Sequence, residues 1–195
     1  PPMPSRRQRQ MCIRDRLNPI IRTFVYFTAL YSIGSVIFKV HFYKYFNEEI
    51  NIYCKKIIRN SALLGLFISI LAFLSVAGNL GGEIESIFEI DLIELSFETM
   101  QGKSYLLLIV GFSFLYFSYY FQNIFVNAFN IIGTVLILIS FIVIGHSLSQ
   151  GIYTQILLLI HLFCISYWLG SFLPFKYMCN ICLLYTSPSP RDKRL

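Results

Sequence analysis

Five apolar runs of about 20 residues recur along this 195-residue chain, and they limit its fold more than any other feature. A helix of about 20 apolar residues spans the hydrocarbon core of a bilayer. Mean hydropathy is +0.63 and 13% of residues are charged, whereas the alternating polar pattern of a membrane barrel is absent. We therefore predict an all-α, polytopic transmembrane bundle of five helices, near residues 19–40, 57–77, 104–121, 124–144 and 152–175.

Small residues at regular spacing mark places where these helices are expected to approach one another. Ala29, Ser32 and Ser35 recur every three residues in the first run, and Gly65 and Ser69 lie four residues apart in the second. Small side chains let the backbones of two membrane helices come close together. We expect tight helix packing at both places.

The stretch 83–98, between the second and third runs, holds most of the acidic residues. Its apolar residues fall near one face of a helix, and its acids lie elsewhere. We therefore predict a short amphipathic helix that lies along the membrane surface. We interpret the acids as the solvated side of this helix rather than as a cation-binding patch. The predicted apolar face consists of Ile84, Ile87, Phe88, Leu92 and Leu95.

The two ends of the chain look foreign to the rest. Residues 6–15, RRQRQMCIRD, are similar to a translated transposase-type sequencing adapter, and residues 182–192, CLLYTSPSPRD, to the opposite adapter read inward. Such segments are excluded from fold reasoning. We expect residues 1–16 and 182–195 to be adapter-derived scars that are disordered and pack against nothing. We then expect residues 17–181 to be the native transmembrane domain, as a fragment of a longer domain.

Removing these ends changes the charge argument. The whole chain carries a net charge of +6, but residues 17–181 hold eight basic and eight acidic side chains, so their net charge is zero. The basic balance therefore gives no indication of nucleic-acid binding. Cys54, Cys164 and Cys179 remain, without CxxC spacing. This pattern supports neither a disulfide framework nor a zinc site.

Lysine and arginine predict the orientation in the membrane. The stretch 39–59 is polar and basic, so we expect it to be a cytoplasmic loop. The stretch 78–103 contains one lysine and is expected outside, as is the turn 145–151. Arg22 lies on the side opposite to that expected from this rule.

His161 is the ionisable side chain in the middle of the fifth apolar run. Because such a residue is costly inside a bilayer, it is a functional-site hypothesis by default. Cys164 and Trp168 follow at i+3 and i+7, on the same helical face. We predict that this face points into the bundle. The alternative is a structural histidine that only hydrogen-bonds a neighbouring helix.

His146 lies in the turn before the fifth run, so two histidines share one hairpin. His161 is about eight residues into that run, roughly 12 Å below the outer surface at about 1.5 Å per residue. A single metal ion needs its ligands within about 2 Å of itself. We therefore interpret the two histidines as successive stations, that is, separate metal-binding positions along a path, rather than as ligands of one closed site.

The arrangement of these residues resembles the bacterial copper resistance protein D (CopD) family. The matching features are Gly34 in the first run, the junction 99–102, the pair 145–146, His161, and Trp168-Leu169-Gly170. The resemblance covers most of residues 17–181, and the order and spacing carry it rather than any single element. The chain departs from the family pattern at Ser171, where a second glycine is usual, and at Lys103, where arginine is usual.

The resemblance implies a multi-pass protein of the bacterial inner membrane that passes copper into the cytoplasm, supplied by a periplasmic copper-binding protein. It implies His161, His146, Cys164 and Met100 as copper contacts. Copper(I) prefers imidazole and soft sulfur ligands, and a transport path needs several weak sites. We see no nucleophile–base pair and no phosphate-binding loop, so we predict no enzyme activity.

Two other functions stay open. A b-type haem protein for electron transfer needs axial histidines that face each other at matched depth, and His161 has no such partner in the sequence. A membrane scaffold that transports nothing needs no ligand at all. A haem absorption band would favour the first, and a protein without bound metal or copper phenotype would favour the second.

Overall fold

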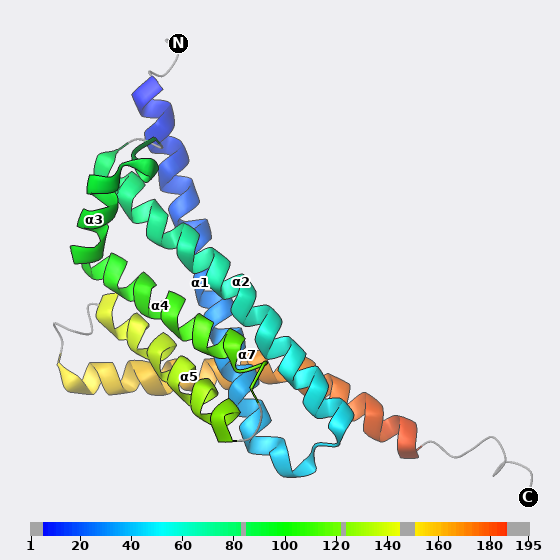
Figure 1. Cartoon of the computed structure of the whole chain (residues 1–195). Coiled ribbons are helices and arrows are strands. Elements are labelled where there is room, and N and C mark those ends of the chain that lie inside the picture. The colour runs from blue at the N-terminus through cyan, green and yellow to red at the C-terminus, as the bar shows by residue number, and fades with distance from the viewer. Residues whose placement is uncertain (1–5, 83–84, 122–123, 145–150, 187–195) are drawn as a thin grey trace, which may run out of the picture.

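The computed structural model describes residues 6–82, 85–121, 124–144 and 151–186, and these residues form helices joined by short links (Figure 1). Five of the helices, α1, α2, α4, α5 and α7, are long and apolar enough to cross a membrane. The predicted all-α membrane bundle is thus confirmed. The elements are α1 (Arg6–Phe42), η1 (Tyr43–Tyr45), α2 (Glu48–Gly81), η2 (Glu85–Phe88), α3 (Ile90–Glu98), α4 (Met100–Phe117), α5 (Ile124–Ile144) and α7 (Ile152–Thr186).

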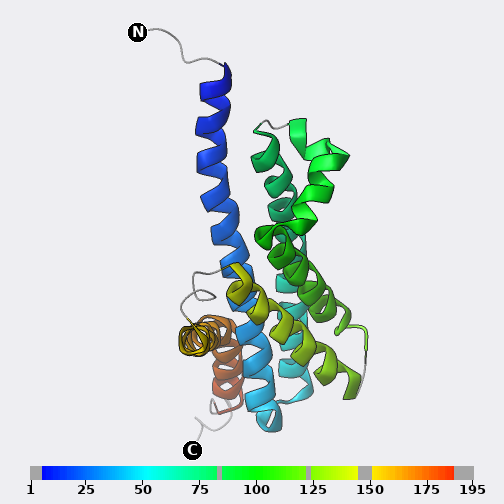
Figure 2. The ribbon, with the colours of Figure 1, turned by 90° about the vertical axis from the view of Figure 1, so that its left-hand side faces the viewer.

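α1 and α2 pack against each other and hold the other long helices on either side. α1 packs against both α2 and α7, and α4 packs between α2 and α5. Figure 2 shows α7 on the far side of α1 from α2 and α4. The core is built mainly from aliphatic and aromatic side chains of α1, α2, α4 and α5, among them Ala29, Ile33, Ala72, Phe112 and Ile137.

Small residues set the closest helix crossings, as predicted for α1 and α2. At Gly34 an added Cβ would overlap the carbonyl oxygen of Ser166 on α7, and at Gly170 it would overlap the backbone of Gly34. At Gly65 it would overlap the ring of Phe112 on α4. Membrane helices gain their association energy from such close packing. The predicted tight approach at these runs is therefore confirmed.

The predicted loop 39–59 is wrong, because most of this stretch is helical. α1 runs to Phe42 and α2 begins at Glu48. The Asn47 side chain accepts a hydrogen bond of 2.8 Å from the backbone N–H of Ile50. Such a cap starts a helix by satisfying an N–H that has no partner inside it. We call this end of the bundle, with the end of α1, η1 and the start of α2, the basic end.

The third predicted helix also begins earlier than expected, at Met100 instead of residue 104. Thr99 caps it, because its hydroxyl accepts a hydrogen bond of 2.9 Å from the N–H of Gly102. α5, in contrast, covers residues 124–144 as predicted.

The chain ends differ in part from expectation. Residues 6–16 continue α1, and residues 182–186 continue α7, so the prediction that they are disordered is wrong. Figure 1 shows both helix ends extending beyond the rest of the bundle. A helix already formed adds residues at little cost, one hydrogen bond for each residue fixed. Residues 1–5 and 187–195 lie outside the described residues, and the adapter origin of both ends stays a prediction.

The acidic stretch forms η2 and α3, which fold back along the end of α2. The side that packs differs from the predicted apolar face. Ser86 and Ser96 are buried, whereas Phe88 is 84% exposed and Leu95 is 44% exposed. An added Cβ on Gly81 would overlap Ser86, so the close approach to α2 favours serines over large apolar side chains.

Pro174 lies inside α7, although we expected the fifth helix to close at 175. A proline has no N–H, so the carbonyl four residues earlier loses its helical partner. That carbonyl belongs to Gly170, and it accepts a hydrogen bond of 3.3 Å from the hydroxyl of Ser35 on α1. Neighbouring helices commonly satisfy freed backbone groups in this way inside membranes. The α1–α7 contact therefore allows α7 to continue past the proline.

Ser35→Ala is expected to destabilise the folded protein by about 0.5–2 kcal/mol, because it leaves the Gly170 carbonyl without a partner inside the bundle. The effect should shrink in a Pro174→Ala background, where alanine restores the missing N–H. A double-mutant cycle, read from unfolding in mixed detergent micelles, measures this coupling. Equal effects of Ser35→Ala in both backgrounds would contradict the explanation.

The orientation leads to a labelling prediction. In a background without native cysteines, a membrane-impermeant thiol reagent applied outside should label Ser149→Cys, in the turn predicted outside, and spare Glu48→Cys at the basic end. Both should react once the membrane is permeabilised. Labelling of Glu48→Cys alone in intact cells would reverse the orientation.

Candidate functional site

His161, Cys164 and Trp168 share one face of α7, as predicted, but that face points away from the described bundle. All three side chains are exposed, and Trp168 is 78% exposed. The opposite stripe, formed by residues 162, 166, 170 and 174, is buried. The prediction that His161 points into the bundle is therefore wrong for the described residues.

The α1–α7 crossing is the physical reason for this orientation. Only small side chains fit where the two backbones meet, and α7 supplies Ser166 and Gly170 there. Successive residues of a helix are turned by about 100°. With the small stripe fixed against α1, the larger His161 and Trp168 are turned outward.

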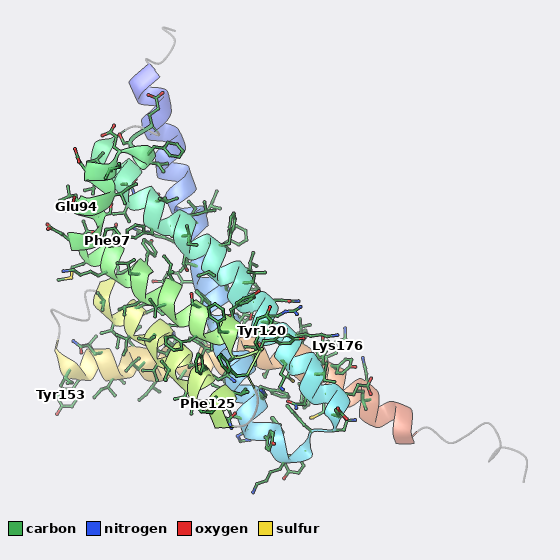
Figure 3. All side chains as sticks on the ribbon, in the orientation of Figure 1. Glu94, Phe97, Tyr120, Phe125, Tyr153 and Lys176 are labelled. Carbon is green, nitrogen blue, oxygen red and sulfur yellow. The ribbon has the colours of Figure 1, made fainter. Side chains whose placement is uncertain are left out.

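The outward face of α7 is otherwise apolar. Leu157, Ile160 and Phe172 are 66%, 55% and 67% exposed. Figure 3 shows Tyr153 in the first turns of α7 pointing away from the other helices. It also labels Lys176, in the C-terminal half of α7. His161 and Cys164 are therefore polar or soft groups on an apolar surface of a membrane span.

An imidazole that faces hydrocarbon without a partner is costly. Within the described ranges, no hydrogen bond joins the His161 ring to another side chain or backbone group. The described residues therefore do not form the alternative of a structural histidine bonded to a neighbouring helix. A partner for the ring would come from outside the described residues, either from protein or from a bound ligand.

The other two predicted copper contacts lie apart from this face. Met100 is the first residue of α4 and is 61% exposed. The hydroxyl of Ser104 donates a hydrogen bond of 2.7 Å to the carbonyl of Ser140, so the start of α4 lies beside the end of α5. Because α4 does not pack against α7 in the described part, Met100 and His161 are not brought together.

His146 lies in 145–150, outside the described residues. Among the residues that are described, no three His, Cys, Asp or Glu side chains lie close enough to hold one metal ion. One copy of the described chain thus offers His161 and Cys164 as a two-residue site rather than a cage.

Sequence reasoning missed a polar cluster at the basic end. Lys39 is 5% exposed and Cys54 is fully buried, and the Tyr177 hydroxyl donates a hydrogen bond of 3.1 Å to Glu49. The rings of Tyr53 and Tyr177 stack with their centroids 3.8 Å apart. The signal was present in the spacing, because Lys39 follows Ser32 and Ser35 at i+7 and i+4 on the buried face of α1.

Comparisons of this chain with models of protein families, with curated proteins and with solved structures find no match.

Proposed function

We propose that this chain is a multi-pass protein of the bacterial inner membrane that moves copper(I), and that copper contacts the outward face of α7. The observation that carries the proposal is the pair His161 and Cys164, one helical turn apart on the exposed face of a membrane span. The resemblance to the CopD family supports the same function. The described geometry favours this face over a path through the centre of the five helices.

The ligand chemistry suits copper as cargo. Thiolate and imidazole are ligands that copper(I) accepts readily. A site with two protein ligands releases its ion more easily than a closed cage, and transport requires such weak sites in succession. No bond is made or broken in the cargo, so the proposal includes no catalytic step.

Met100 would serve as an earlier station. It lies at the end of the bundle opposite to the basic end, because α4 begins beside the end of α5. In the predicted orientation this end faces the periplasm, where a copper-binding partner protein would deliver the ion. The thioether of Met100 is exposed there and is a soft ligand.

Competition with a chromophoric copper(I) chelator tests the proposal on the purified chain. We expect at least about tenfold weaker binding for His161→Ala and for Cys164→Ser, because loss of a group that only orients a ligand already costs about that much. His41→Ala is the matched control, because His41 is an exposed histidine on another helix. A haem absorption band on purification would favour electron transfer, and equal affinity of all variants would favour the scaffold.

A further inference from the structure

A groove of about 370 Å³ lies between α1, α5 and α7. Its walls are apolar, with Val36 and Val40 from α1, Val135 and Leu138 from α5, and Phe163 from α7. Every lining residue belongs to one of three membrane spans. An occupant of this groove must therefore be a hydrocarbon chain or another apolar surface rather than a water-soluble ligand.

One end of the groove is polar, and a lysine lies one helical turn beyond it. His41 lines it there, and its ring meets that of Tyr167 with centroids 6.0 Å apart. Lys44 follows one turn later in η1 and is exposed. Glu49, at the start of α2, accepts a hydrogen bond from the Tyr177 hydroxyl. The exposed Lys44 can reach an anionic group outside the chain.

A second polar group lies along the wall. The hydroxyl oxygen of Thr134, a lining residue, is buried and has no hydrogen-bond partner among the residues that the structure describes. Thr134 belongs to α5, whose first turns lie at the basic end, because the Arg59 guanidinium lies 4.6 Å from the ring centroid of Tyr119 just before α5. The groove therefore runs from the basic end toward the middle of the bundle.

We propose that this groove binds one acyl chain of an anionic phospholipid, with the lipid phosphate near His41 and Lys44. The apolar walls select a hydrocarbon chain, and Lys44 beyond the polar end selects an anionic headgroup over a zwitterionic one. The volume falls within the range of specific ligand sites, about 300–1,000 Å³. In the predicted orientation the headgroup belongs to the cytoplasmic leaflet, where the negative surface potential attracts such basic groups.

A second groove on the same protein provides the matched control. It lies between α1 and α2, has a volume of about 280 Å³, and is lined by Phe27, Tyr31 and Leu64 among others. Val135 and Leu64 are similarly exposed, at 46% and 50%. Val135→Trp fills the first groove, and Leu64→Trp places the same bulk in the second.

Native mass spectrometry of the full chain, released from nanodiscs with equal amounts of phosphatidylglycerol and phosphatidylcholine, tests the proposal. We expect several-fold preferential retention of phosphatidylglycerol, loss of this preference in Val135→Trp, and no change in Leu64→Trp. Lys44→Glu should reduce the preference while total lipid retention persists, and Lys56→Glu, an exposed lysine outside the groove, should not.

Three results would overturn the proposal. These are equal retention of the two lipids by the unchanged chain, equal loss in Val135→Trp and Leu64→Trp, or a change of oligomeric state in Val135→Trp without a change in lipid retention. The last result would make the groove an interface between copies. If Val135→Trp does not fold, the Lys44→Glu and Lys56→Glu pair decides the headgroup site.

Discussion

Replacement of His161 by alanine is expected to abolish copper-dependent accumulation in cells that express the chain, while membrane insertion stays intact. The imidazole nitrogen is one of the two metal-binding groups on the exposed face of α7, and alanine offers no atom that could replace it. Loss of a group that only orients a metal ligand commonly lowers metal affinity about 10–100-fold, so loss of the ligand itself should cost at least as much. Copper per cell, measured by elemental mass spectrometry, and protein in the membrane fraction together provide the readout.

Controls on α7 separate the loss of a ligand from a general change of surface. Leu157→Ala alters the same exposed face one turn earlier, at a side chain that is 66% exposed, and should accumulate copper normally. His146→Ala should have a smaller effect than His161→Ala, since a station at the surface is easier to bypass. Normal accumulation with His161→Ala would remove the main support for the copper proposal.

Gly34→Val is expected to have the largest effect on stability. A side chain on Gly34 would overlap the Ser166 carbonyl on α7, so the two helices must separate along the α1–α7 contact. Overpacking of a core costs about 1–3 kcal/mol, and more where the obstacle is backbone. We therefore expect at least about 3 kcal/mol of destabilisation in detergent unfolding, with loss of the monodisperse folded peak in size-exclusion chromatography.

A substitution on the exposed side of α7 is the control for this experiment. Ile160 is 55% exposed, so Ile160→Val removes one methylene without touching α1 and should leave stability within about 0.5 kcal/mol. A folded and equally stable Gly34→Val protein would show that α1 and α7 do not pack at this glycine.

The helices could be predicted from the sequence because apolar run length is a local property. α5 shows this best, since its bounds, Ile124–Ile144, coincide with those of its apolar run. The ends of the other helices could not be predicted as well. Asn47 and Thr99 start α2 and α4 outside the apolar runs, and Ser35 allows α7 to continue past Pro174 through a contact 135 residues away in sequence.

The orientation of the candidate site was not predicted correctly from the sequence, for a different reason. Helical spacing correctly placed His161, Cys164 and Trp168 on one face, but spacing alone does not determine which face meets a neighbour. The small residues Ser166 and Gly170 determine this, and their partner Gly34 lies on a helix at the other end of the chain. Weighing these small residues against His161 would have predicted the outward orientation.

The α1–α7 crossing also has a consequence for biosynthesis. Ser35 and Gly170 are separated by 135 residues, and translation proceeds at about 5–20 residues per second, so α1 waits roughly 7–27 s for its partner to emerge. During this interval the Gly34 surface of α1 has no native helix against it. Lipid, α2 or an insertion chaperone must cover this surface. Slower translation near α7 lengthens the period during which the nascent protein can pack α1 against a wrong partner.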